Sequence, residues 1–280
     1  MKRKIEEFKK KLGEIQEIST LPQVMARILD IITDENSSAA DLADEIVKDK
    51  SLTAKILKMV NSAYYGFYRE IVKVSDAVVV LGFNEIRRLS LAISVLDMFS
   101  RGDRAGHRMR LWNHSLICAA MSDILDKQWR MNDKSAFTAG LLHDIGKAVL
   151  DQYFPDMFAA VLECMEAKSL SASEAEEELF GFDHADIGYW LSERWNLPVS
   201  LSDAIHHHHR PDAAQTVPKL ARLVNIADHF ANEFTRLKTA GLPFAELTLK
   251  DGISPEEGVQ LLFKLDKRMR GSAVVANTFI

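Results

Sequence analysis

The chain has 280 residues, of which 47% are hydrophobic and 27% are charged, a composition typical of a globular protein with a sizeable core. The formal net charge of −5 gives no overall attraction for nucleic acid or for an anionic membrane. No apolar run approaches the ~18 residues of a membrane span, and the charged start Met1–Lys4 lacks the apolar segment of a signal peptide. The two cysteines, Cys118 and Cys164, suit a reducing compartment rather than a disulfide framework. We therefore expect a soluble, cytoplasmic protein.

Helical periodicity dominates the first hundred residues. One apolar stripe on a charged first segment predicts an amphipathic helix and consists of Ile5, Phe8, Leu12 and Ile15. Pro22 suits the first turn of a second helix. Ser38, with Asp41 three residues later, resembles a capping box that opens a third. Further helices are expected over residues 52–60 and 84–99.

Strand-like patterns are almost absent. The short segment Ala77–Leu81 is rich in β-branched residues, and it reads either as a strand or as buried helix. The polar, glycine-bearing stretch Ser100–Gly106 separates the first helices from a histidine-rich half, and the two halves either share a core or are joined by a flexible linker. Regularity falls again after Leu237, before a last helix expected over 256–270. The chain is predicted to be all-α, with an N-terminal helical subdomain (1–100), a metal-binding helical subdomain (101–237) and a C-terminal helical extension (238–280).

Side chains suited to binding a divalent metal recur along the histidine-rich half. His143 and Asp144 stand side by side in the apolar, helical-looking segment Leu141–Lys147, and an imidazole nitrogen and a carboxylate oxygen are both good metal ligands. The pair alone is weak evidence, so the rest of a coordination sphere has to lie elsewhere. Candidates on other predicted helices are His114, His184, His208, His209 and Asp228.

Local patterns support two of these candidates. Asp183 is a good N-cap for a helix that begins at His184, and Gly188 one turn later leaves room for close packing. Asp228 shares a helix face with apolar residues, and burying a lone carboxylate costs several kcal/mol unless it is paired or metal-bound. The alternative to a metal is an ion pair with Arg222 or Arg194.

The ordered set of histidines and aspartates resembles the HD phosphohydrolase superfamily, especially its HD-GYP branch, in which the matching positions bind two or three metal ions and hydrolyse a phosphodiester in cyclic di-GMP. The N-terminal half resembles the narrower HDOD family (HD-related output domain), a family of bacterial regulatory modules. The segments that carry this resemblance are Leu21-Pro22, Asp49–Leu57, Val60–Gly66 and Ala77–Gly82. The resemblance implies an HD-domain-like helical bundle with a role in signal transduction.

The resemblance also implies a centre of two divalent metal ions, with iron or manganese favoured and nickel, zinc or magnesium as alternatives. Asp144 would bridge both ions, and the other candidate ligands would share the remaining positions. Lys147 would hold a phosphate oxygen or the leaving oxygen, although it could instead complement a helix C-terminus. The family spacing selects His208 and His209 from the histidine run, so His206 and His207 are expected to be exposed.

Two departures from the HD-GYP pattern narrow the function. Arg210-Pro211 follows the paired histidines where that branch has a glutamate and then a Gly-Tyr-Pro motif, and Arg110 stands where trinuclear members have a glutamate. We therefore expect at most two metals and disfavour cyclic di-GMP cleavage. The expected reaction is hydrolysis of a nucleotide or another phosphoester.

The alternative is a non-catalytic scaffold that binds a signalling protein and keeps a structural metal site. In that case the aromatic segment Tyr64–Tyr68 supplies either contacts to the partner or buried packing between the halves. A DNA-binding helix pair over residues 41–57 is disfavoured, because it offers few basic side chains and its first helix is acidic.

Overall fold

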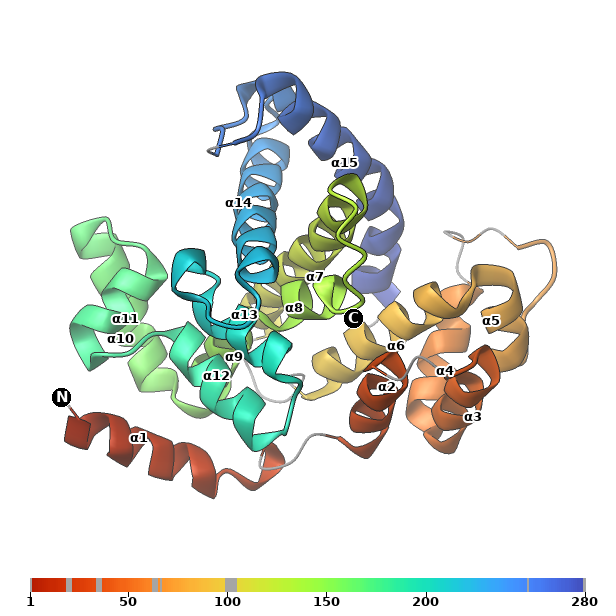
Figure 1. Ribbon diagram of the computed structural model, residues 1–280, viewed down its shortest axis with the longest axis horizontal. Helices are drawn as coiled ribbons and strands as arrows, with labels where there is room; N and C mark the ends of the chain where they lie inside the picture. Colours follow the sequence, from red (N-terminus) through yellow and green to blue (C-terminus); the bar gives the residue numbers. More distant parts are fainter. Residues whose placement is uncertain are drawn as a thin grey trace.

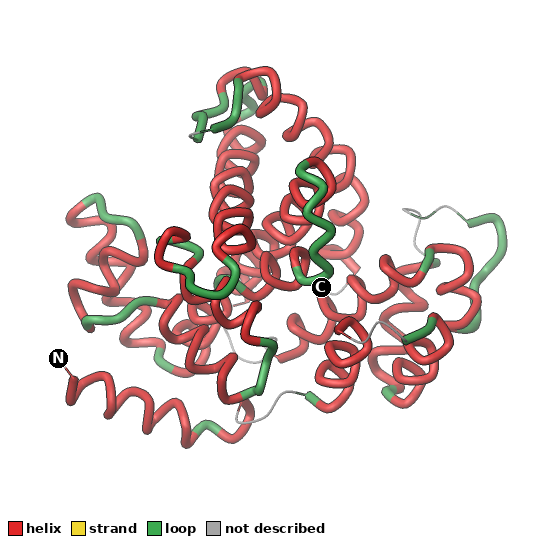
Figure 2. The backbone as a smooth tube through the Cα atoms, viewed as in Figure 1, coloured by secondary structure: helices red, strands yellow, loops and turns green. Residues whose placement is uncertain are grey.

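The structure is a computed structural model, and it describes residues 2–18, 22–33, 37–61, 65, 67–98, 105–250 and 252–278. These residues form helices joined by turns and loops, and they contain no strand (Figure 2). The predicted all-α fold is therefore confirmed.

The helices follow one another in two sets and a final helix (Figure 1). The N-terminal set is α1 (Lys2–Glu14), α2 (Gln23–Thr33), α3 (Ala39–Lys48), α4 (Lys50–Val60), α5 (Val74–Leu81) and α6 (Phe83–Met98). The histidine-bearing set is α7 (Ala105–Gln128), α8 (Ala136–Leu142), α9 (Ile145–Tyr153), α10 (Pro155–Lys168), α11 (Ala172–Phe180), α12 (His184–Arg194), α13 (Val199–His207) and α14 (Pro218–Ala240). Short 3-10 turns are η1 (Gln16–Ile18), η2 (Pro211–Ala213) and η3 (Phe244–Glu246), and the final helix is α15 (Pro255–Thr278).

Local sequence signals explain where several helices begin. The Ser38 hydroxyl accepts a hydrogen bond from the Asp41 amide, and the Asp41 carboxylate accepts one from the Ser38 amide, which completes the predicted capping box of α3. Asp183 caps α12 in the same reciprocal way with Asp186. The segment Ala77–Leu81 belongs to helix α5, so it is helical as one of the two interpretations predicted; it is only partly buried, because Val79 and Val80 are exposed.

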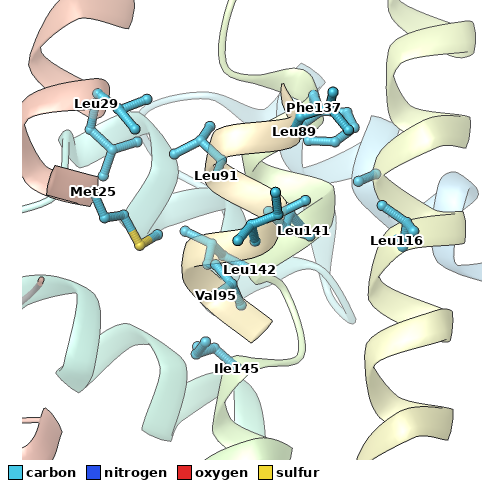
Figure 3. Close-up of a cluster of buried hydrophobic side chains, with 14 of the residues drawn as sticks. Met25, Leu29, Leu89, Leu91, Val95, Leu116, Phe137, Leu141, Leu142 and Ile145 are labelled. Carbon is cyan, nitrogen blue, oxygen red and sulfur yellow. The ribbon is translucent and has the colours of Figure 1, made fainter. Parts of the chain in front are cut away.

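One hydrophobic cluster joins helices on both sides of the predicted boundary near residue 100. Figure 3 shows buried side chains of α2 and α6 meeting side chains of α8 and the start of α9. They include Met25, Leu29, Leu89, Leu91, Val95, Leu141, Leu142 and Ile145. The two halves therefore share a core. The boundary itself lies outside the described residues except for Ala105 and Gly106, which begin α7, and the division into three parts stays a prediction.

Helix α1 packs against the histidine-bearing helices, a placement that its sequence position does not predict (Figure 1). The ring centroid of Phe8 lies 4.6 Å from that of Phe154 and 4.7 Å from that of Phe182. Just beyond α1, the Trp195 indole donates a hydrogen bond of 3.0 Å to the carbonyl of Ile18. The N-terminal segment, from α1 to Ile18, thus packs against α12 and the residue that follows it.

A second hydrophobic cluster joins α7, α13, α14 and α15. Met121 of α7, Phe230 of α14 and Leu261 of α15 are each at most 1% exposed. The C-terminal extension is therefore packed onto the histidine-bearing helices. Its last helix runs longer than the predicted 256–270.

The aromatic segment Tyr64–Tyr68 divides between core and surface, and its Tyr64 and Gly66 lie outside the described residues. Tyr65 and Phe67 are partly buried against the first hydrophobic cluster, and their rings are parallel with centroids 6.2 Å apart. Tyr68 is fully exposed. Packing therefore accounts for the first two of these aromatic side chains.

The helix pair α3–α4 carries few free cations for a nucleic acid, because Lys55 forms an ion pair with Asp97. None of the helices in the described part of the chain combines the length and the apolar character needed to cross a membrane.

Candidate metal centre

The structure brings all seven predicted ligand residues together at one buried centre, although they come from different helices. His114 lies on α7 and Asp228 on α14, His184 is the first residue of α12, and His208 and His209 follow α13. His143 and Asp144 lie between α8 and α9.

The position of His143 and Asp144 corrects the prediction of one continuous helix. Helix α8 ends at Leu142 and α9 begins at Ile145, so the pair occupies the junction. Within a regular helix neighbouring side chains point about 100° apart. At this break between the helices both side chains face the same centre, where each is at most 4% exposed.

A first group of donor atoms consists of His114, His143 and Asp228. The Nε2 atom of His114 lies 3.0 Å from Asp228 Oδ1 and 3.3 Å from His143 Nε2. His143 Nε2 lies 3.8 Å from the same Asp228 oxygen. Two imidazole nitrogens and a carboxylate oxygen thus converge, which is a donor set suited to a divalent transition metal.

A second group consists of His184, His208 and His209, whose donor nitrogens all lie within 4.8 Å of one another. The Nε2 atoms of His184 and His209 are 2.8 Å apart. His184 and His208 are fully buried, and His209 is partly exposed. Three imidazoles therefore converge beside the first group.

The carboxylate of Asp144 lies between the two groups and turns one oxygen towards each. Its Oδ2 atom lies 3.5 Å from His114 Nε2 and 3.4 Å from His143 Nε2. Its Oδ1 atom lies 3.2 Å from His184 Nε2 and 3.8 Å from His208 Nε2. This is the arrangement expected of a carboxylate that bridges two ions.

Two buried atoms at the centre have no hydrogen-bond partner among the described residues: Asp144 Oδ1 and His208 Nε2. Buried polar atoms are normally satisfied, because an unpaired one costs about 1–3 kcal/mol. A metal ion would satisfy both atoms, so the donor set fits a divalent cation.

Backbone carbonyls orient two of the imidazole rings. His143 Nδ1 lies 2.8 Å from the carbonyl oxygen of Gly140, and His208 Nδ1 lies 2.7 Å from that of Ile205. A carbonyl can only accept, so Nδ1 carries the hydrogen and the neutral ring keeps its lone pair on Nε2. In both residues this lone pair faces the centre.

Burial and neighbouring charges split the pKa values within the centre. Burial lowers the pKa of His143, but Asp144, Cys118 and Asp228 together outweigh burial and raise that pKa well above its usual value. Burial and Lys147 lower the pKa of His184, yet Glu176 and Asp144 raise it to about 9. Burial and the charge of His184 lower the pKa of His209 to about 3. The rings therefore differ in how strongly they hold a proton, with which a metal would compete.

Lys147 reaches the centre from the first turn of α9, where its Nζ donates a 2.7 Å hydrogen bond to Asp144 Oδ2. The alternative that Lys147 complements a helix C-terminus is therefore wrong. Burial lowers the pKa of Lys147, but the charges of Asp144 and Asp228 outweigh it and raise that pKa. The ammonium group stays charged beside the candidate bridging carboxylate.

Asp228 does not use the arginine partners considered as its alternative. Arg222 pairs with Asp212, and Arg194 donates to the carbonyl of Gly13. Asp228 instead faces His114 and accepts a 2.9 Å hydrogen bond from the Asn232 amide. Its carboxylate thus belongs to the histidine cluster.

His206 and His207 are partly buried, which corrects the expectation that they are exposed. His206 Nε2 lies 3.0 Å from Asp186 Oδ1, and its ring stacks on Tyr189 with centroids 4.4 Å apart. His207 Nε2 lies 3.5 Å from Asp203 Oδ1. The packing of α13 beside α12 supplies the partners of His206, whereas Asp203, the partner of His207, lies one turn earlier on α13 itself.

A cavity of about 410 Å³ opens beside the second group of ligands. His209 forms part of its wall, so the cavity adjoins the candidate metal centre. Its other lining residues are Glu177, Gly181, Phe182, Asp183, Asp186, His206, His207, Arg210 and Ala213.

Glu176, a carboxylate of α11 that is 1% exposed, is a residue of the centre that the sequence did not predict. Its Oε2 atom accepts two hydrogen bonds of 2.7 Å, one from the His184 amide and one from His184 Nδ1. In sequence Glu176 stands in the acidic run Glu174–Glu178, which is typical of a solvated surface. The only signal is that it shares a helix face with Ala172 and Phe180, one turn to either side.

Two glycines allow the helices around the centre to approach closely. A Cβ on Gly146 would lie 2.0 Å from the His184 carbonyl oxygen. A Cβ on Gly188 would lie 2.8 Å from Ile205 Cγ2, which confirms the close packing predicted there. The role of Gly146 is not predicted by the sequence.

Comparison with known proteins identifies relatives of this fold. The family model of the HDOD domain matches residues 18–211. An uncharacterized protein of Treponema pallidum is 25% identical over 238 residues, which cover 82% of this chain and 45% of that protein. Ribonuclease Y of Thermus thermophilus is 31% identical over 125 residues, which cover 45% of this chain and 17% of that enzyme. The chain thus spans less than half the length of these curated relatives.

Two solved structures share the fold over nearly the whole chain. An HDOD domain protein of Geobacter sulfurreducens has a TM-score of 0.70 at 24% identity, covering 91% of this chain and 90% of its own. A protein of Shewanella amazonensis, named as a candidate phosphohydrolase, has a TM-score of 0.73 at 24% identity and covers 96% and 98%. At these identities the likeness establishes the fold alone.

Proposed function

Because this chain belongs to the HDOD family, we propose that it is a bacterial signal-transduction regulator with a dinuclear metal centre that hydrolyses a phosphoester. The observation that carries the proposal is the Asp144 carboxylate, which turns one oxygen towards each of two histidine-rich groups. Burying a carboxylate is costly unless its charge is compensated, and two cations bridged by Asp144 would compensate it.

The ligands divide between the two ions. His114, His143 and Asp228 would hold one ion, and His184, His208 and His209 would hold the other. Nitrogen and carboxylate donors suit iron or manganese, with nickel, zinc or magnesium as alternatives. Two bound divalent cations would supply Lewis acidity, which would lower the pKa of a water molecule so that hydroxide is available near neutral pH to attack phosphorus.

Asp144 and Lys147 are the proposed catalytic residues. Asp144 would bind both ions and fix their positions relative to each other, because one of its oxygens faces each group. The charged Lys147 ammonium lies within hydrogen-bond reach of that carboxylate. It is therefore positioned to donate to a non-bridging phosphate oxygen or to the leaving oxygen.

The cavity beside His209 is large enough for part of a nucleotide or a similar phosphoester. Its lining includes three carboxylates, those of Glu177, Asp183 and Asp186, and only one arginine, Arg210. These carboxylates disfavour a second phosphate in the cavity. Together with the missing Gly-Tyr-Pro motif, they argue against cyclic di-GMP as the substrate. The relative Ribonuclease Y, by its name, supports phosphoester chemistry for this helical unit.

The second candidate function is a scaffold that binds a signalling protein and keeps the metal centre for stability. Exposed apolar side chains on α5 and the loop before it favour this function: Tyr68 is fully exposed, and Val72 and Val79 are 64% and 84% exposed. Either function would operate in the cytoplasm.

Metal analysis of the purified protein tests the centre, and a panel of nucleotides and other phosphoesters tests the activity. We expect close to two equivalents of metal in the reconstituted wild-type protein and metal-dependent turnover of at least one substrate. Asp144→Asn keeps the shape of the side chain but removes its charge, and it should lose both. Asp212→Asn is the matched control, because Asp212 is exposed and pairs with Arg222.

Fewer than about 0.3 equivalents of metal in the folded wild-type protein would contradict the proposed metal centre. If metal-loaded wild-type protein and Asp144→Asn are equally inert across the panel, the scaffold function is favoured instead.

A further inference from the structure

Glu176 is the buried carboxylate that orients His184. Its Oε2 atom lies 2.7 Å from both the backbone nitrogen and Nδ1 of His184. His184 is the first residue of α12, so one oxygen fixes both the start of the helix and the plane of the ring. With Nδ1 donating to Glu176, the neutral ring presents Nε2 to the candidate metal centre.

The hydrogen-bond acceptor behind His184 differs from those behind His143 and His208. His143 and His208 donate from Nδ1 to the backbone carbonyls of Gly140 and Ile205, which are neutral acceptors. His184 donates to a carboxylate. A carboxylate behind a metal-binding imidazole increases the basicity of the ring more than a carbonyl does.

The two groups of ligands also differ in charge. Asp228 gives the first group a negative charge of its own, whereas the second group consists of three imidazoles, which are neutral when they bind a metal. Glu176 stands directly behind the second group and lies 1% exposed, where its charge is poorly screened. Its carboxylate therefore supplies, from behind His184, the charge that the second group lacks.

We propose that Glu176 is a positioning residue that sets the affinity of the ion held by His184, His208 and His209, while the ion held by His114, His143 and Asp228 is independent of it. The proposal rests on the dinuclear centre proposed above. It makes the two metal positions inequivalent, and it gives α11, which carries no ligand, control over one of them.

Glu176→Gln isolates the charge from the hydrogen bonds. The glutamine carbonyl can accept from the His184 amide and Nδ1 as the carboxylate does. The new amide group would replace Oε1, an atom with no hydrogen-bond partner among the described residues. Loss of a carboxylate in this position typically weakens metal binding about 10- to 100-fold.

The test is a titration of the apo protein with Mn²⁺, followed by calorimetry and by the electron paramagnetic resonance of free Mn²⁺. We expect two binding classes in the wild-type protein. In Glu176→Gln one class should weaken about 10- to 100-fold and the other should not change. Glu178→Gln, two residues further along α11, is the control, because Glu178 is exposed and pairs with Lys168. It should bind as the wild type does.

A spectroscopic measurement on the wild type keeps the proposal testable if Glu176→Gln fails to fold. Nitrogen-15 spectra of histidine-labelled protein loaded with Zn²⁺ should show that His184 Nδ1 carries a hydrogen. The proton signal of this N–H group should be shifted downfield, because its acceptor is a carboxylate. A ring without that hydrogen would overturn the proposal, as would a Glu176→Gln variant that binds both ions with wild-type affinity or weakens both equally. If the wild-type protein binds no Mn²⁺, the dinuclear centre itself fails, and this outcome is distinct from the others.

Discussion

Substituting Gly146 with alanine should disrupt the contact between α9 and α12 on which the candidate centre depends. A Cβ at this position would lie 2.0 Å from the His184 carbonyl oxygen, 2.8 Å from its carbonyl carbon and 3.0 Å from its Cα. All three atoms belong to the backbone, so no side chain can rotate away. Restoring an ordinary contact of 3.4 Å requires the two helices to separate by about 1.4 Å.

The expected loss of stability combines two opposing effects. Overpacking of this kind costs about 1–3 kcal/mol, whereas replacing a helical glycine with alanine contributes up to about 1 kcal/mol of helix propensity. The net change is a destabilisation of about 1–2 kcal/mol, equivalent to a fall of roughly 2–8 °C in melting temperature for a chain of this size. Displacement of His184 should also weaken metal binding, since metal ligands tolerate shifts of only about 0.5 Å.

Thermal denaturation in the presence of a chelator measures the stability effect, and Mn²⁺ titration measures the effect on the centre. Gly13→Ala is the matched control, because the nearest atom to its added Cβ is the end of the Arg194 side chain, at 3.2 Å. That variant should melt at or slightly above the wild-type temperature. The reasoning would be refuted if Gly146→Ala were as stable as Gly13→Ala and bound Mn²⁺ with wild-type affinity.

Two further predictions concern regions away from the centre. Phe8→Ala should remove the aromatic contacts that hold α1 against Phe154 and Phe182; the expected loss is about 3–5 kcal/mol by urea denaturation, and a change below about 1 kcal/mol would show that α1 contributes little. Glu233 accepts hydrogen bonds from Arg236 and from the Thr248 amide, and these hold its pKa at about 2, below the usual 4.5. A depressed carboxyl pKa stabilises the folded state above about pH 4.5, and this stability is lost as the pH falls towards 2. Because Arg236 is 43% exposed, we expect Glu233→Gln to lose about 1–2 kcal/mol at pH 7. Its stability should converge with that of the wild type near pH 2, and a deficit that stays constant with pH would contradict the explanation.

The sequence predicts most of the fold because its signals are local. The capping box at Ser38 and the N-cap at Asp183 depend on residues within one turn, and both form as expected. The residues proposed as metal ligands were also identifiable, because the chemistry of their side chains and their order along the chain are visible without a structure. That they approach one another is a property of the fold.

Features that depend on distant contacts could not be predicted. Glu176 lies in an acidic run that resembles a solvated surface, and its burial results from the way α11 packs against the start of α12. The amphipathic stripe of α1 predicts a buried face but not its neighbour, and that face meets residues about 150 positions away. The partners of His206 come from α12, so these contacts form only when α12 and α13 pack together.

The two groups at the centre differ in how far apart their members lie along the chain. His184 and His209 are separated by 25 residues along the chain, whereas His114 and Asp228 are separated by 114. Closing the longer loop costs about 1.3 kcal/mol more in chain entropy. During folding, the short segment from Glu176 to His209 can therefore assemble its donor atoms early, before α7 and α14 have docked. Chain topology thus favours an order in time, in which the donor atoms of one group come together before those of the other group.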